Sequence, residues 1–238
     1  MKQKLKFSSV AATIVACIAV CMMLAGCSGS YKIKMTTETD KVNFYLRGSG
    51  VATVDWGDGS EKVSLTLNEE DVVEFEHTYP YASIRTITVN GENITILDCR
   101  DILLTTLDVS KNTALTHLDC SDNKLTNLDV SKNTVLTYLD CDFNQLTTLD
   151  VSKNIAMIYL SCGYNSLTSL DVSKNNVLSL LMCPNNKFTT EGLNALFGTL
   201  PRNPIIEDKE IILHGMPGLE LCDKSIAELK GWSVVTEY

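Results

Sequence analysis

The chain has 238 residues, 45% of them hydrophobic, a size and composition that allow one or two packed domains and argue against a disordered chain. It carries 20 Lys and Arg against 29 Asp and Glu, a formal net charge of −9. Because binding to phosphates requires a basic surface, this balance argues against nucleic acid as a partner.

Residues 1–26 have the layout of a secretory signal peptide. Three lysines precede an apolar run over residues 10–24, and small residues follow. The segment Leu24-Ala25-Gly26-Cys27 resembles the bacterial lipobox, which implies cleavage before Cys27 and lipid attachment to that cysteine. An uncleaved membrane anchor is the alternative. No later stretch approaches the ~20 apolar residues of a membrane span.

Residues 27–30 form a short tether after the lipidation site. This tether lacks the aspartate that, by analogy with lipobox proteins of Gram-negative bacteria, indicates retention at the inner membrane. We therefore expect a lipid-anchored protein of the bacterial cell envelope, at the outer membrane. The side of that membrane on which the chain lies stays open.

Residues 31–90 are predicted to form a small β-sandwich, because short alternating runs are separated by turn signals such as Gly48-Ser49-Gly50. The expected strands are Tyr31–Thr37, Val42–Leu46, Val51–Asp55, Val63–Leu67, Val72–Glu76 and Ile84–Val89.

Within this segment, Trp56-Gly57-Asp58-Gly59 followed by His77-Thr78-Tyr79 resembles the signatures of the polycystic-kidney-disease-type β-sandwich domain. The tryptophan stands directly before Gly-Asp-Gly, so the family spacing is only approximate. The resemblance implies a spacer or interaction module of an extracellular protein. We expect Asp58 to hold a turn through backbone amides; calcium binding with Asp55 is the alternative, with few ligands.

The middle of the chain repeats every 21 residues. Four segments open with the letters LDVSKN, and they start at Leu107, Leu128, Leu149 and Leu170. One such unit cannot bury its own apolar edge, so the period predicts a solenoid of stacked copies.

Each copy contains an L-x-x-L-x-C-x-x-N-x-L pattern, whose alternation predicts one short strand of a parallel sheet. The cysteine then lies inside, as a small buried hydrophobe. Disulfides or a metal site are the alternatives. However, the cysteines occupy equivalent positions in successive copies, called rungs below, and lack a paired spacing such as C-x-x-C. We expect no metal and no cofactor. The cysteines are Cys99, Cys120, Cys141, Cys162 and Cys183.

Polar residues also recur at fixed positions. An asparagine three residues after the cysteine is expected to bond backbone groups where the chain bends, as at Asn123, Asn144, Asn165 and Asn186. The aspartate and lysine of each LDVSKN segment are expected to form solvated ladders with screened ion pairs.

The pattern resembles the leucine-rich repeat family, in the nested 21-residue variety of bacterial lipoproteins. The match runs from about residue 94 to 190, and its first copy carries Ile102 where the asparagine belongs. The resemblance implies a leucine-rich repeat solenoid over residues 91–190.

Residues 191–238 break the period and are expected to form an α/β cap over the last repeat. A helix is predicted over Thr190–Phe197, a strand over Glu210–Leu213, a second helix from Asp223 to Gly231, and a strand over Trp232–Thr236. The whole chain is thus predicted to be mainly β, of the α+β class.

Positions that vary among copies lie on the outward face of the strands. Tyrosines beside carboxylates there favour a recognition surface, although aromatic residues can also simply cover a sheet. The candidate ligand-binding residues are His117, Asp119, Tyr138, Asp140, Asp142, Phe143, Tyr159 and Tyr164.

The sequence contains no recognisable catalytic motif. The three histidines are scattered, and there is no zinc, nucleophile-elbow or phosphate-loop signature. We expect a non-enzymatic, lipid-anchored binding protein whose partner is a protein or a glycan. An envelope-associated hydrolase using carboxylates such as Asp119, and a purely structural spacer, are the alternatives.

Overall fold

The protein is represented by a computed structural model that describes residues 32–236. These residues belong to one compact unit. The expected signal peptide, the tether and the lipidation residue Cys27 lie outside the described residues. No helix within the described part of the chain combines the length and the apolar character needed to cross a bilayer.

The first strands pair around one long central strand. Strand β2 is antiparallel to β4 and β6 through its first half and to β3 and β5 through its second half, and β1 pairs with β5 and β7. Strands are thus present at the predicted places. The bounds are β1 Lys32–Thr37, β2 Lys41–Asp55, β3 Val63–Leu67, β4 Val73–Thr78, β5 Arg85–Asn90, β6 Asn93–Asp98 and β7 Leu104–Asp108.

The turn predicted at Gly48-Ser49-Gly50 is wrong, because β2 runs through it without a break. The glycine at 48 instead allows a close approach: a Cβ there would lie 1.9 Å from the carbonyl oxygen of Asn93 on β6. The pairing register also shifts between Arg47 and Gly48. Gly48 therefore lies at a bulge where β2 changes partners, rather than in a hairpin turn.

The motif residues of this segment form one connected cluster. The Trp56 ring stacks on His77 at 4.8 Å, and the Tyr79 hydroxyl donates to the Trp56 carbonyl at 2.8 Å. Asp58 accepts the Ser60 main-chain N–H at 2.9 Å and lies 2.8 Å from His77 Nε2. Hydrogen bonds from Ser60 and His77 hold the pKa of Asp58 well below its usual range. The predicted Asp58 turn is confirmed.

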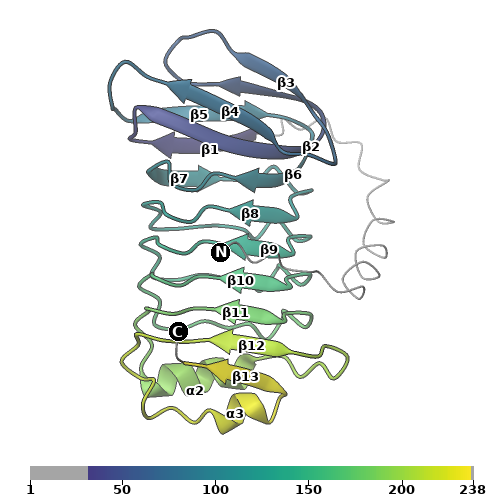
Figure 1. Cartoon of the computed structure of the whole chain (residues 1–238), viewed down its shortest axis with the longest axis vertical. Coiled ribbons are helices and arrows are strands. Elements are labelled where there is room, and N and C mark those ends of the chain that lie inside the picture. Colours follow the sequence, from purple (N-terminus) through teal and green to yellow (C-terminus); the bar gives the residue numbers. More distant parts are fainter. Residues whose placement is uncertain (1–31, 237–238) are drawn as a thin grey trace, which may run out of the picture. The chain divides into compact units, whose positions relative to one another are not determined.

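The predicted parallel sheet is present, and it continues directly from the N-terminal strands (Figure 1). Strand β6 pairs with β2 on one side and with β8 on the other, so the sheet runs through the expected boundary at residues 90 and 91. The later strands pair in register at 21-residue intervals: β8 His117–Asp119, β9 Tyr138–Asp140, β10 Tyr159–Ser161 and β11 Leu180–Met182. The described chain is therefore a mainly-β solenoid.

The five repeat cysteines are fully buried and unbridged, as their interpretation as core residues predicts. Cys120 Sγ donates to the carbonyl of Asp140 in the next rung at 3.5 Å, and Cys141 Sγ donates to Ser161 at 3.3 Å. Burial raises the pKa of both thiols well above the usual range, so they stay protonated. Cys222 is also unbridged, and it is only half-buried.

The predicted asparagine ladder is confirmed, and each amide side chain joins two successive turns of the coil. Asn144 Nδ2 lies 3.0 Å from the Cys120 carbonyl of the preceding rung and 3.2 Å from that of Cys141. Its Oδ1 accepts the Leu125 N–H at 2.9 Å. A second, fully buried ladder occupies the other half of each repeat, where Asn133 Nδ2 donates to the carbonyls of Val109 and Asn112. Asparagine Nδ2 groups thus bond carbonyls of the preceding copy in both halves of the repeat, but Asn133 Oδ1, unlike Asn144 Oδ1, has no hydrogen-bond partner among the described residues.

The expected ion pairs of the LDVSKN segments are not formed. No ion pair among the described residues joins these aspartates and lysines. Each aspartate instead accepts the main-chain N–H of the serine two residues later, as Asp129 does from Ser131 at 2.9 Å. A carboxylate so close to a local donor gains more from closing a turn than from an exposed lysine.

The C-terminal residues continue the sheet and close its end. Helix α2 (Thr190–Thr199) begins at Thr189, whose side chain accepts the Gly192 N–H. Strand β12 (Lys209–Ile212) pairs parallel with β11, and β13 (Trp232–Val235) pairs parallel with β12. The second predicted helix is reduced to α3 (Ser225–Glu228). The elements of the cap were thus predicted, with boundaries shifted by a few residues.

We expect Asn144→Ala to lower the free energy of unfolding by about 2–4 kcal/mol, because it leaves buried carbonyls of two rungs and a Leu125 N–H without their partner. Lys132→Ala, an exposed substitution in the same region, is the control and should change the free energy by less than about 0.5 kcal/mol. Denaturant unfolding of both variants measures the difference. Equal losses would contradict the role of the ladder.

Candidate functional site

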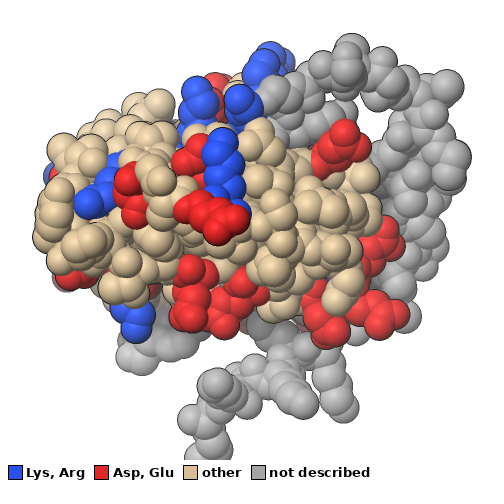
Figure 2. Space-filling model, turned by 90° about the horizontal axis from the view of Figure 1, so that it is seen from above, with Lys and Arg blue, Asp and Glu red and all other residues tan. Residues whose placement is uncertain are grey.

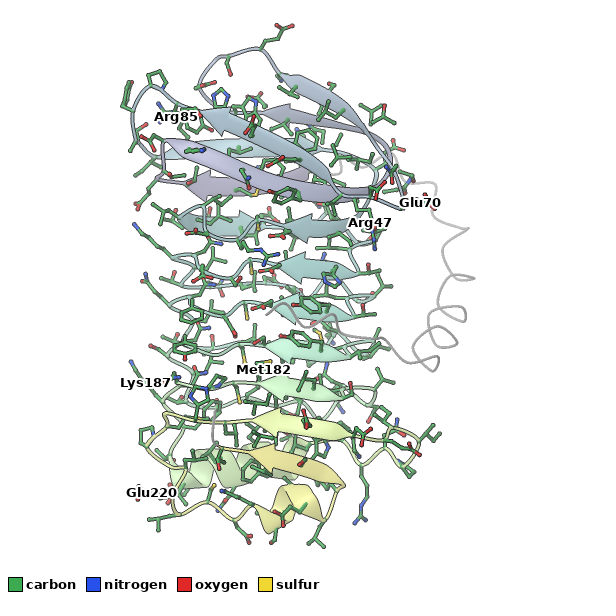
Figure 3. The ribbon with its side chains drawn as sticks, viewed as in Figure 1. Arg47, Glu70, Arg85, Met182, Lys187 and Glu220 are labelled. Carbon is green, nitrogen blue, oxygen red and sulfur yellow. The ribbon has the colours of Figure 1, made fainter. Side chains whose placement is uncertain are left out.

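The outward face of the parallel sheet carries a column of stacked rings. The register pairs His117 with Tyr138 and Tyr138 with Tyr159. Ring centroids are 3.9 and 4.3 Å apart, with interplanar angles of 3° for both pairs. We call these three residues the first aromatic stack; the alignment of side chains from strand to strand is visible in Figure 3. Burial and the nearby Arg47 lower the pKa of His117, which favours its neutral form.

Beside this stack runs a column of carboxylates. Strand pairing aligns Asp98, Asp119 and Asp140, and the Arg100 guanidinium neutralises the first two. Arg100 Nε donates to Asp98 at 2.9 Å, and its terminal nitrogen lies 3.4 Å from Asp119. We call Asp98, Asp119, Asp140 and the adjoining Asp142 the acidic stripe. Within residues 32–236, ion pairs reach only the first two members of this stripe.

Asp140 and Asp142 are half-buried and take part in no ion pair among the described residues. Asp140 accepts the main-chain N–H of Asp142 at 3.0 Å, and Asp142 accepts that of Gly163. Burial, reinforced by the neighbouring charge of Asp142, raises the pKa of Asp140 to about 7. Burial also raises the pKa of Asp142. These two carboxyl groups are therefore poorly solvated, and nearby donors and the charge of Arg100 compensate their burial only in part.

A second pair of rings lies one residue beyond the stripe on each rung. Phe143 and Tyr164 stack with centroids 4.0 Å apart and an interplanar angle of 11°, and both rings are substantially exposed, at 46% and 39%. Both residues have left-handed backbone, with φ of 52° and 50°. Equivalent positions hold Asp122 and Asn185, types that tolerate this conformation, whereas a bulky aromatic residue there is strained. We call Phe143 and Tyr164 the second aromatic stack.

The N-terminal end of this face is hollowed. An open depression of about 530 Å³ lies where the repeat strands meet β2 and the segment before β4. It is lined by Tyr45, Val72, Ile96, Asp98, Arg100, His117, Asp119, Tyr138 and Asp140.

The structure brings the sequence-predicted residues together on one side of the coil. His117, Tyr138 and Tyr159 form one stack, Phe143 and Tyr164 form the other, and Asp119, Asp140 and Asp142 belong to the acidic stripe. Sequence reasoning missed Arg100 and Tyr45. Aligning the residue after each cysteine would have found Arg100, because it is the one basic residue among Arg100, Ser121, Asp142, Gly163 and Pro184.

Among the described residues, no group of three or more His, Cys, Asp or Glu side chains is placed to bind a metal ion. Seen from the end that carries the N-terminal strands, acidic and basic side chains both appear, with no broad basic surface on that face (Figure 2). Tyrosine rings, hydroxyls and carboxylates are the chemistry that the sheet presents.

Solved structures similar to part of the chain are bacterial leucine-rich repeat proteins. One is the functional domain of InlJ from Listeria monocytogenes, a structure described as including a cysteine ladder; it is 43% identical over 57% of this chain and 28% of that one, with a TM-score of 0.46. Another is the leucine-rich repeat protein LIC12759 of Leptospira interrogans, 20% identical over 55% of this chain and 38% of that one, with a TM-score of 0.41.

This chain therefore spans well under half the length of either protein. No family model and no curated protein matches it.

Asp140→Asn should stabilise the protein at pH 8 but not at pH 4. The raised pKa means that the folded state still holds a proton that the unfolded state releases above about pH 4, so this group lowers stability as the pH rises towards 7. Removing the charge should return up to about 4 kcal/mol at pH 8, since the pKa is raised from about 4 to about 7 and one pKa unit corresponds to about 1.4 kcal/mol. Urea unfolding at both pH values measures this.

Asp129→Asn is the matched control. Hydrogen bonds from Ser131 lower the pKa of Asp129, so its charge stabilises the fold at neutral pH and that contribution disappears as the pH falls through its folded pKa. This variant should lose stability at pH 8. A gain for both variants would point to net charge rather than to the environment of Asp140.

Proposed function

We propose that this chain is a non-catalytic binding protein of the leucine-rich repeat type, which recognises a protein partner with the outward face of its parallel sheet. One observation carries the proposal: stacked tyrosines lie beside half-buried carboxylates that have no cation of their own. Tyr138 and Asp140 are adjacent members of these two columns. Large rings held by stacking supply contact area at little cost in side-chain entropy.

The shape of the site supports binding over catalysis. Rungs repeat at roughly 4.8 Å, so the stripe is a row of like carboxylates on an open face, whereas hydrolases enclose one pair of acids in a pocket. An extended, open face fits a partner that covers several rungs at once. A glycan chain is the other ligand that could lie along such a face.

The N-terminal residues complete the proposed architecture. We assign a signal peptide to residues 1–26 and a lipid anchor to Cys27, which would tether the chain at the bacterial outer membrane. In this arrangement strands β1 to β5 act as a sandwich-type spacer module, similar to the polycystic-kidney-disease domain, between the anchor and the repeats. The cluster of Trp56, His77 and Tyr79 supports that assignment.

The double variant Tyr138→Ala with Tyr159→Ala should lose binding. Labelled full-length protein is applied to arrays of extended peptides and of bacterial and host glycans, and the signal on the ligands found with the wild type should fall at least about tenfold. The melting temperature should fall by only a few degrees, because each aromatic pair contributes roughly 0.5–1.5 kcal/mol.

Tyr81→Ala, which removes a tyrosine that is 66% exposed in the connection between β4 and β5, is the control and should leave the array signal unchanged. Unaltered binding by the double variant would reject the aromatic face as the binding surface. The absence of any ligand on the arrays would favour a purely structural spacer.

The raised pKa of Asp140, about 7, favours one second candidate, an envelope hydrolase in which this group is the general acid. A carboxylic acid that holds its proton near neutrality beside a second carboxyl group, here Asp119, is the pairing that glycoside hydrolysis uses. Turnover of oligosaccharide substrates that is lost in both Asp140→Asn and Asp119→Asn, with the fold intact, would establish this candidate. We expect no turnover by the wild type.

A further inference from the structure

The acidic stripe already binds one guanidinium, that of its own Arg100. This side chain reaches Asp98 and Asp119 from the position directly after the inward Cys99. It is held although 58% of the side chain is exposed, which shows that paired carboxylates of neighbouring rungs accept a planar cation at this face.

The next rungs repeat the acids without the cation. Asp140 occupies the position of Asp119 in the next repeat. Asp142 occupies the position that Arg100 holds two repeats earlier, so an acidic side chain stands where the first rung has a basic one. Neither carboxylate forms an ion pair with a lysine or arginine within the described residues, and the charge of Arg100 offsets only part of the rise in the pKa of Asp140. Ionising both half-buried groups without a paired cation is costly to the folded protein, and an incoming cation would offset that cost.

The surroundings suit a side chain that is both flat and charged. In chain order along the rung, these carboxylates come between Tyr138 of the first aromatic stack and Phe143 of the second. The Ser161 hydroxyl is fully buried on the neighbouring strand; it offsets part of the rise in the pKa of Asp142, yet it makes no hydrogen bond of regular geometry. The Ser161 hydroxyl is thus a desolvated polar group beside Asp142.

Other ligand classes fit less well. Anions are repelled by the stripe, and a metal ion lacks a group of three ligands among the described residues. Sugar rings bind aromatic residues through the ring faces, but within both stacks the inner faces are covered by the neighbouring ring. The edges, hydroxyls and carboxylates that remain favour a cationic side chain.

We propose that Asp140 and Asp142 bind an arginine side chain of the protein partner, repeating on the third rung the contact that Arg100 makes on the first. The inference rests on the proposed function and names its ligand chemistry. Arginine fits better than lysine because its planar fork can bridge two carboxylates, and because it stays charged and packs well beside aromatic rings.

The test is a titration of the isotope-labelled full-length protein with acetyl-Gly-Arg-Gly-amide, followed by NMR at about 0.15 M salt, where long-range attraction is screened. The same peptide with citrulline, a neutral analogue of arginine, is the ligand control. We expect the arginine peptide to bind about tenfold more tightly than the citrulline peptide, with shifts centred on Asp140 and Asp142.

Two double variants with the same change of charge separate a site from general electrostatics. Asp140→Asn with Asp142→Asn should abolish the preference for arginine, whereas Asp129→Asn with Asp150→Asn, on the exposed turns, should leave it within about twofold. Equal affinity for both peptides, equal losses in both double variants, or no binding of the arginine peptide would overturn the arginine site.

These outcomes are distinguishable from failure of the proposed function. Array ligands that need Tyr138 and Tyr159 but contain no arginine would reject only the arginine site. No array ligand together with no peptide binding would reject both.

Discussion

The fold depends on hydrogen bonds that each rung makes with the next, at a spacing that the 21-residue period keeps constant. Asn144 shows the constraint most clearly, because one amide group satisfies carbonyls of its own rung and of the rung before it. Such a contact exists only if the neighbouring copy is in register. Stability is therefore a property of adjacent pairs of repeats, and the ends of the coil need partners of other kinds.

Those partners differ at the two ends. At the N-terminal end, Ile102 replaces the ladder asparagine. Asn123 Oδ1 accepts the main-chain N–H groups of Ile102 and Leu104, but Ile102 has no side-chain amide to continue the ladder. The Ile102 carbonyl is bonded instead by Thr37 of β1. At the other end, β12 and β13 extend the sheet with non-repeating sequence. Helices α2 and α3 lie at that end of the coil (Figure 1). Both ends thus satisfy the backbone without continuing the pattern.

Much of this could be predicted from the sequence, because equivalent residues of successive copies occupy equivalent positions in the structure. The inward cysteines, the asparagine ladder and the register of His117 with Tyr138 all follow from the period. The long strand β2 could not be predicted, since its glycines are turn-formers by local preference and the close approach of Asn93 to Gly48 is a tertiary contact. For the same reason Tyr45 was missed, because its place beside the repeat strands depends on that pairing.

Identical rungs have a consequence for how such a coil can change over generations. Gain or loss of one 21-residue copy leaves every interface between neighbours chemically the same and leaves both end caps attached to the same kind of rung. Unequal recombination could therefore lengthen or shorten the row of outward side chains in whole steps. Substitutions at those outward positions would then diversify specificity while the interior is inherited unaltered.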